Sequence, residues 1–168
     1  EIKINELREL TDWEKPIYLK VGASRPYYDT MLAVKAGADV IVLDGMQGGT
    51  AATQEVFIEH VGIPTLACIR PAVKALQDLG MHRKVQLIIS GGIRNGADVA
   101  KAMALGADGV YMGTRFIATH EAPVHQNVKD AIVADDTAGT VTMTLAQPWG
   151  PFLATIANSW GSIMDTRG

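Results

Sequence analysis

The sequence predicts an α/β fold of the parallel (β/α) TIM-barrel type, of which only the C-terminal five or six βα units are present. Short apolar runs begin at residues 17, 40, 65, 86 and 109, at intervals of 23, 25, 21 and 23 residues. A helical pattern follows each of the first four runs, and alternating strands and helices form parallel sheets covered by helices. Gly-Ala-Asp also recurs at 37–39 and 106–108, which predicts a repeated helix-to-strand corner. Doubly wound sheets use similar corners, so this repeat favours a barrel only modestly.

The first half of the chain predicts two strands and their helices. Residues 2–13 have Leu at helical spacing and predict a short amphipathic helix. The β-rich run 17–21 (IYLKV) predicts the first strand, and a proline near its start predicts a helix over 26–36. Residues 40–43 predict the second strand, and 52–60 a helix that a glycine ends.

The next segment predicts three further strands. Residues 65–69 (TLACI) predict the third strand, and Arg70-Pro71 opens a helix that extends to about residue 79. Residues 86–89 predict the fourth strand, with a helix over about 97–105. The run 86–90 is β-branched-rich and suited to burial on both faces of a parallel sheet, and residues 109–112 predict the fifth strand.

The C-terminal tail does not supply three more units. Residues 127–134 predict a helix, 141–145 (VTMTL) a sixth strand and 152–160 a closing helix. We therefore expect a partial barrel over 1–120, with a C-terminal helical appendage of the same domain over 121–168. A part-barrel has two open strand edges, which favour self-association, so we expect a homo-oligomer.

Composition restricts the class of protein. The 168 residues are 48% hydrophobic and 20% charged, and a net charge of −3 gives no basic surface for nucleic acid or an anionic membrane. No run is apolar enough to span a bilayer, and the charged N-terminus is unlike a signal peptide, so we expect a cytoplasmic protein. The lone Cys68 excludes an intrachain disulfide and a cysteine-ligated metal or iron–sulfur site, and it is expected to be a buried structural thiol. Because the chain begins with Glu1 rather than Met, we expect a processed product or a fragment.

Two glycine turns suggest a phosphate site. Gly91-Gly92 follows the fourth predicted strand, and Gly113-Thr114 follows the fifth. Glycine lets the backbone turn tightly and lets its N–H groups approach a ligand, and a helix start adds further donors. The loops after the last two strands of a (β/α)₈ barrel form such a site. A single glycine turn would be weak evidence, but two successive ones predict a phosphate-bearing ligand.

Four segments together resemble a known family. They are KPIYLKVGAS, ADVIVLDGMQGGTAATQ, GIPTLACIRPAVKALQDLGM and VQLIISGGIRNGADVAKAMALGAD. Over about residues 15–110 the chain resembles the second half of the FMN-binding synthase domain of the glutamate synthase large subunit, including the N-methylglutamate synthase subunit. The resemblance implies a TIM barrel with FMN at its C-terminal mouth. It also implies addition of ammonia or an amine to 2-oxoglutarate and reduction of the imine to a glutamate.

The resemblance also implies roles for individual residues. Lys20 matches the strand lysine that lies against the flavin, where a cation stabilises negative charge on the reduced ring. Gln47 matches a loop residue that donates to a carboxylate or a flavin carbonyl, and Arg94 or, with slight preference, Arg115 pairs with the phosphate. Lys20 and Gln47 are the implied catalytic residues, with no metal. The implied cofactor-binding residues are Lys20, Asp44, Gly48, Gly49, Thr50, Ser90, Gly91, Gly92, Ile93, Gly113, Thr114 and Arg115.

The C-terminal part departs from that family. From Met112 the sequence MGTRFIATHEAPVHQNVKDAIVADDT resembles the nitronate monooxygenases, which are also FMN barrels. Their base is a histidine in the glycine-rich loop, but Thr50 lies near that place here. His120 and His125 lie on the helical tail and are expected at the surface, so nitronate chemistry is not supported. The inosine monophosphate dehydrogenases share both glycine turns but need a loop cysteine, and Cys68 is a poor candidate.

Three functional interpretations follow. The first is an FMN-dependent oxidoreductase of the glutamate synthase type, which works in a larger assembly where partner subunits supply the ammonia or amine and the reductant. The second is a non-catalytic, split or designed half-barrel that self-associates and binds at most a phosphate or a flavin. The third is another barrel enzyme, either a nitronate monooxygenase-like FMN enzyme or a sugar-phosphate enzyme, for which Asp44 is the one well-placed carboxylate. Retention of flavin distinguishes the first from the second.

Overall fold

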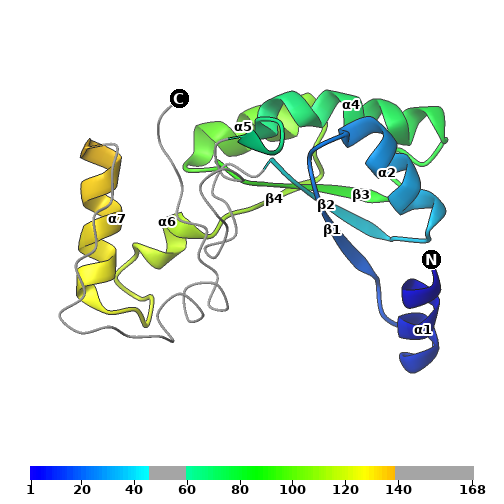
Figure 1. Cartoon of the computed structure of the whole chain (residues 1–168), viewed down its shortest axis with the longest axis horizontal. Helices are drawn as coiled ribbons and strands as arrows, with labels where there is room; N and C mark the ends of the chain where they lie inside the picture. Colours follow the sequence, from blue (N-terminus) through cyan, green and yellow to red (C-terminus); the bar gives the residue numbers. More distant parts are fainter. Residues whose placement is uncertain (46–59, 139–168) are drawn as a thin grey trace. The chain divides into compact units, whose positions relative to one another are not determined.

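The structure is a computed structural model that describes residues 1–45 and 60–138, with side chains to residue 133. The chain divides into two units, one of Glu1–Met46 with Gly62–Tyr111, the other of Gln47–Val61 with Met112–Gly168. The first unit contains, in order, α1 (Ile2–Leu10), β1 (Tyr18–Gly22), α2 (Pro26–Lys35), β2 (Val40–Asp44), α4 (Thr65–Asp78), β3 (Gln86–Ser90), α5 (Gly96–Leu105) and β4 (Gly109–Tyr111) (Figure 1).

The four strands form one parallel sheet in the order β1-β2-β3-β4. Strands that are adjacent in the sheet are therefore consecutive among the described strands. A doubly wound sheet reverses its strand order at a switch point, whereas a barrel adds each new strand on the same side. The observed order is that of a barrel.

The helices cover one face of this sheet. Strand residues alternate between two faces, and on one face Ile41, Leu43, Leu87 and Ile89 are buried beneath α2, α4 and α5. Figure 1 shows these three helices on the same side of the strands. On the other face Tyr18 and Tyr111 are exposed, as are Lys20 and Gln86. One-sided covering and sequential strand order confirm the predicted fold class, a part-barrel of the (β/α) type.

The predicted third strand is wrong. Residues 65–69 begin α4, which runs unbroken to Asp78 with Pro71 inside it rather than at its start. A short apolar run fits a buried strand or a buried helix equally well, and only a longer window separates them. In this window the buried positions recur every three or four residues, which is helical: Thr65, Cys68, Ile69, Ala72, Val73, Ala75 and Leu76.

The two Gly-Ala-Asp corners have the same structure. Gly37 and Gly106 end α2 and α5 with φ of +95° and +110°, a backbone conformation that favours glycine, and the alanine after each is buried. The aspartate then binds the neighbouring strand: Asp39 accepts from the Ile17 N–H at 2.7 Å, and Asp108 accepts from the Leu87 N–H at 2.9 Å. The repeat in the sequence therefore corresponds to a repeated contact between strands.

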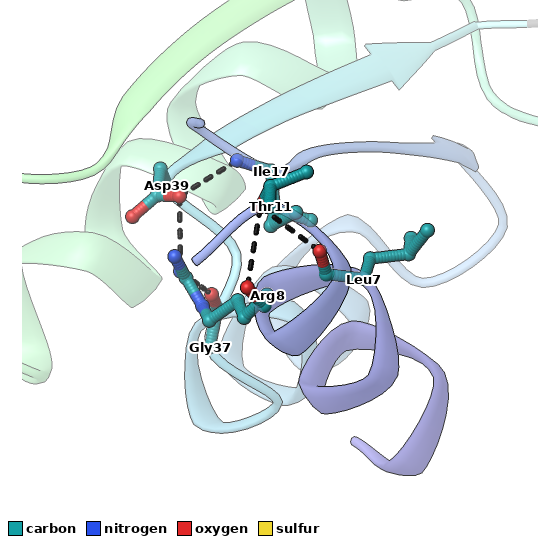
Figure 2. A network of polar contacts seen from close by, with 6 residues as sticks. All are labelled: Leu7, Arg8, Thr11, Ile17, Gly37 and Asp39. Carbon is teal, nitrogen blue, oxygen red and sulfur yellow. Dashed lines mark hydrogen bonds and ion pairs between the residues drawn. The ribbon is translucent and has the colours of Figure 1, made fainter. Parts of the chain in front are cut away.

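An arginine pairs with the aspartate at each corner. Arg8 of α1 donates to the Gly37 carbonyl at 2.6 Å and to the Asp39 carboxylate at 2.9 Å (Figure 2). Arg83 pairs with Asp108 at 2.5 Å. Burial by itself raises the pKa of Asp39, but the hydrogen bonds from Ile17 and Arg8, together with the Arg8 charge, bring it below its usual value.

The lowered pKa of Asp39 predicts a pH-dependent contribution to stability. A carboxyl group whose pKa is lower in the folded state stabilises the fold above its unfolded-state pKa, and this contribution is lost as the pH falls through the folded value. We expect Asp39→Asn, which keeps the shape but not the charge, to be less stable than the wild type above about pH 4, with a difference that shrinks below it. Urea unfolding at several pH values measures this, and a difference that does not change with pH would contradict it.

The second unit contains α6 (Thr114–Ile117) and α7 (Gln126–Ala138) among its described residues. The helix predicted over 127–134 is thereby confirmed, as are those over 26–36 and 97–105 to within a residue or two, while the N-terminal helix ends at Leu10. The predicted strand 141–145, the helix 152–160 and most of the helix 52–60 lie outside the described residues. No helix in the described part of the chain is long and apolar enough to cross a membrane.

Candidate functional site

The carboxyl ends of the four strands bring four polar or small residues into one row. Gly22, Asp44, Ser90 and Tyr111 are register partners across β1 to β4. Lys20 lies two residues before Gly22 and so points to the same face, the one that α2, α4 and α5 leave uncovered. Ligands of (β/α) barrels bind at the carboxyl ends of the strands, so this row is the candidate site.

Lys20 and Asp44 form an ion pair within this row. The Lys20 Nζ lies 2.8 Å from the Asp44 Oδ2, and the Ser90 hydroxyl donates to the same oxygen at 3.2 Å. The Asp44 side chain is 11% exposed, whereas that of Lys20 is 55% exposed. The Asp44 carboxylate is therefore largely buried within the site, and the Lys20 ammonium is the group that a ligand can reach. Asp44, which was expected to bind the cofactor, pairs with Lys20 and accepts the Ser90 hydrogen bond.

The turn after β3 offers backbone donors. Gly91 and Gly92 have φ of +91° and +70°, so both positions favour glycine and the predicted tight turn is present. The N–H groups of Gly91, Gly92 and Ile93 have no acceptor within residues 1–45 and 60–138. Successive unpaired N–H groups at a turn form an anion-binding concavity, and this donor set fits a phosphate.

The base of the turn is tied to its neighbours. The Ser90 carbonyl accepts from the Gly45 N–H and from the Thr65 hydroxyl, each at 3.0 Å. It thus joins the end of β3 to the end of β2 and to the start of α4. On the other side, the Ala23 N–H donates to the Asp44 carbonyl at 2.7 Å. These bonds fix the carboxyl ends of β1, β2 and β3 relative to one another.

The first turn of α5 is occupied by its own side chains. The Asn95 Oδ1 accepts from the Asp98 N–H at 3.0 Å, and the Asp98 carboxylate accepts from the Arg94 N–H at 3.2 Å. Burial alone raises the pKa of Asp98, but the hydrogen bonds from Arg94 and Lys101 and the charges of both bring it below its usual value. The Asp98 carboxylate repels a phosphate, and the Asp98 N–H is already bonded to Asn95, so this helix start offers a ligand fewer donors than expected. Arg94 is already paired with Asp98 at 3.5 Å.

The remaining predicted residues lie elsewhere. Gly113, Thr114 and Arg115 belong to the second unit, where Gly113 caps α6 and its carbonyl accepts from the Phe116 N–H at 2.9 Å. The predicted glycine turn at a helix start is therefore present, and Arg115 is exposed. Four predicted loop residues lie outside the described residues: Gln47, Gly48, Gly49 and Thr50.

Tyr111 is a site residue that the sequence reasoning missed. Its ring centroid lies 5.6 Å from the Lys20 Nζ, within the range of a cation–π contact. Its position in the sequence could have indicated this role, because Tyr111 is the last residue of its strand, as Ser90 and Asp44 are of theirs. Aligning the three strand ends would have placed it beside them.

Cys68 was expected to be a buried structural thiol, and His120 and His125 were expected at the surface. Cys68 is buried in α4 rather than in a strand, and its thiol donates to the Ile63 carbonyl at 3.0 Å. Burial raises the pKa of this thiol to about 11, which suits a structural residue and not a nucleophile. His120 and His125 are exposed as predicted, but they lie in the connection between α6 and α7 rather than on a helix. Within the described ranges, no cluster of His, Cys, Asp and Glu could hold a metal.

Comparison with known proteins adds independent information. Residues 1–127 match the family described as a conserved region in glutamate synthase. The chain is 84% identical over 114 residues to a glutamate synthase large subunit-like protein of Rhizobium meliloti (strain 1021), a match that covers 68% of this chain and 26% of that protein. It is 43% identical over 113 residues to an archaeal glutamate synthase (NADPH) of Methanocaldococcus jannaschii, with 66% and 22% covered.

Solved structures give the same fold. FabK from Thermotoga maritima superposes with a TM-score of 0.58 at 30% identity, over 76% of this chain and 35% of that one. The chain spans about a quarter of the length of these curated relatives and about a third of that of FabK. The matches therefore cover one part of longer proteins.

Proposed function

The chain belongs to the glutamate synthase family, and from that premise we propose that it is part of an FMN-dependent oxidoreductase that aminates 2-oxoglutarate. The nitrogen comes from ammonia or an amine, and the product is a glutamate. The observation that supports this most directly is that the strand-end row offers a reachable cation, Lys20, and that the N–H groups of Gly91 to Ile93 have no acceptor among the described residues. A phosphate-bearing flavin needs both kinds of group.

The reaction balances with one two-electron donor. Condensation of 2-oxoglutarate with ammonia releases water and gives an imine. A hydride added to the imine carbon and a proton added to its nitrogen then give glutamate. Reduced FMN, when bound, would supply the hydride, and a two-electron donor on a partner subunit would reduce the oxidised flavin again. NADPH appears in the names of the archaeal relatives, so a nicotinamide is the class of donor that we propose.

The residues of this chain would bind and orient the cofactor. The N–H groups of Gly91, Gly92 and Ile93 would hold the phosphate, and the family resemblance is the ground on which we propose Gly113, Thr114 and Arg115 as further phosphate-binding residues. The Lys20 ammonium would stabilise negative charge on the flavin ring, since a fixed cation lowers the free energy of an anion in a partly dry site. Gln47 and the glycine loop 48–50 are proposed to border the ring and the 2-oxoacid.

We propose that further chains complete the barrel. Within the described strands, β1 and β4 each pair on one side only, and an unpaired strand edge promotes association. Partner subunits, the missing part of the barrel or a second copy would cover these edges. The same contacts would enclose the flavin ring on the face that α2, α4 and α5 leave open.

Titration of the chain with FMN, followed by flavin fluorescence, tests the proposal. We expect saturable quenching by the wild type and an affinity at least about tenfold lower for Lys20→Met, because the variant loses the one cation of the strand-end row. Lys74→Met is the matched control. Lys74 also pairs with an aspartate, Asp78, at 2.9 Å, but it lies on the outer helix α4.

The outcomes separate the interpretations. Equal weakening by both lysine variants would assign the effect to net charge and would contradict a site at Lys20. A wild-type chain that does not bind FMN saturably would contradict the proposed function and favour the half-barrel scaffold. Binding with the expected pattern would justify assays with 2-oxoglutarate and ammonia or methylamine in the presence of the partner subunits.

A further inference from the structure

The ammonium group of Lys20 has two contacts, one with a carboxylate and one with an aromatic ring. The Asp44 Oδ2 lies 2.8 Å from the Nζ, and the centroid of the Tyr111 ring lies 5.6 Å from it. The three residues come from β1, β2 and β4. A long lysine side chain ordinarily samples many rotamers, and ordering it costs conformational entropy, so two contacts from different strands restrict where the charge lies.

The contact with Tyr111 crosses the sheet. β1 and β4 are separated by β2 and β3, so their backbones would lie about 14 Å apart in a flat sheet with the usual strand spacing. Lys20 extends from β1 to Asp44 of β2, and its ammonium also reaches the Tyr111 ring of β4. The charge therefore lies over the middle of the uncovered face and not beside its own strand.

We propose that Tyr111 is a positioning residue, whose ring holds the Lys20 ammonium over the carboxyl ends of β2 and β3 for contact with the flavin. The inference rests on the proposed function for its ligand, but the placement of Lys20 does not depend on a ligand. The ring face and not the hydroxyl makes this contact, because the attraction comes from the quadrupole of the ring. Tyr111→Phe therefore keeps the contact, and Tyr111→Leu removes it.

The ligand-free chain gives the first readout. Protons above an aromatic ring resonate upfield, so the ε-methylene protons of Lys20 should be shifted upfield of those of the other lysines in NMR spectra of the chain with labelled lysine. Lys20→Met identifies the signal. We expect the shift to persist in Tyr111→Phe and to be lost in Tyr111→Leu. Tyr28→Leu is the control, since Tyr28 is exposed on α2, which covers the opposite face.

FMN affinity gives the second readout. We expect Tyr111→Leu to bind FMN about two- to fivefold more weakly than the wild type, and Tyr111→Phe to bind like the wild type. In a Lys20→Met background, Tyr111→Leu should have no further effect, because a residue that acts through Lys20 loses its role when Lys20 is absent. Thermal unfolding confirms that each variant is folded, and Tyr111 is 42% exposed, so little core is lost.

Each result has a defined meaning. A Lys20 signal that is unchanged in Tyr111→Leu overturns the proposal. An equal loss of FMN affinity with and without Lys20 also overturns it, because Tyr111 would then act on the ligand directly. An upfield Lys20 signal that depends on the ring, in a chain that does not bind FMN, supports the placement of Lys20 by Tyr111 and contradicts the proposed function alone.

Discussion

Replacing Leu87 by alanine is expected to lower the free energy of unfolding by about 3–4 kcal/mol. Leu87 is fully buried on the central strand β3 and belongs to the cluster that joins the sheet to α4 and α5. The variant loses the transfer free energy of the removed carbon atoms, and it leaves a cavity that β3 and its helices fill only partly. Urea unfolding followed by far-ultraviolet circular dichroism measures the difference.

Met103→Ala is the matched control for this prediction. Met103 lies on α5 and is 43% exposed, so its truncation removes less buried surface and leaves no closed cavity. Alanine also has the highest helix propensity, so we expect a loss below about 1 kcal/mol. A similar decrease in the free energy of unfolding for the two variants would show that the Leu87 side chain is not packed against the helices as described.

Replacing Gly45 by alanine is expected to cost about 3 kcal/mol, near the upper end of the range for overpacked sites. A Cβ added to Gly45 would lie 2.6 Å from the Thr65 backbone nitrogen and 2.7 Å from its Cα. These are backbone atoms at the start of α4, so the helix or the end of β2 must move. Movement would also weaken the bonds from Gly45 and Thr65 to the Ser90 carbonyl. We therefore expect weaker FMN binding together with lower stability.

Gly96→Ala provides the comparison for Gly45→Ala. Gly96 is the first residue of α5, and a Cβ there meets nothing within 4 Å. Because alanine favours the helix, we expect this variant to be as stable as the wild type or slightly more stable. If Gly45→Ala also left the free energy of unfolding unchanged, the end of β2 would not approach the start of α4 as closely as described.

Much of the fold follows from local patterns. The runs at 18–22, 40–44, 86–90 and 109–111 are strands as predicted, because each is short, apolar and bounded by glycine or proline. The repeated Gly-Ala-Asp corner predicted a left-handed glycine, and the structure has one at Gly37 and another at Gly106. The segment 65–69 is the exception, since its strand-like composition is overridden by the helical spacing of the residues after it.

The candidate site was predictable in its chemistry but not in its contacts. The glycine motif after Ser90 indicated a phosphate turn from the residues, and the family resemblance indicated a cation at Lys20. Their partners come from other strands, and one sequence without register does not show which side chains meet. The pairing of Asp44 with Lys20 was not predicted, and Tyr111 was not considered.

The sequence by itself determined the parallel α/β class, the glycine turns and the family, because these depend on residue type and spacing within short segments. The tertiary structure decided that the sheet has helices on one face, that residues 65–69 are helical and that Lys20 contacts both Asp44 and Tyr111. The physical reason is that each of these depends on contacts between segments that are distant in the chain. Strand register brings residues 20, 44, 90 and 111 to one edge, and no local propensity contains that information.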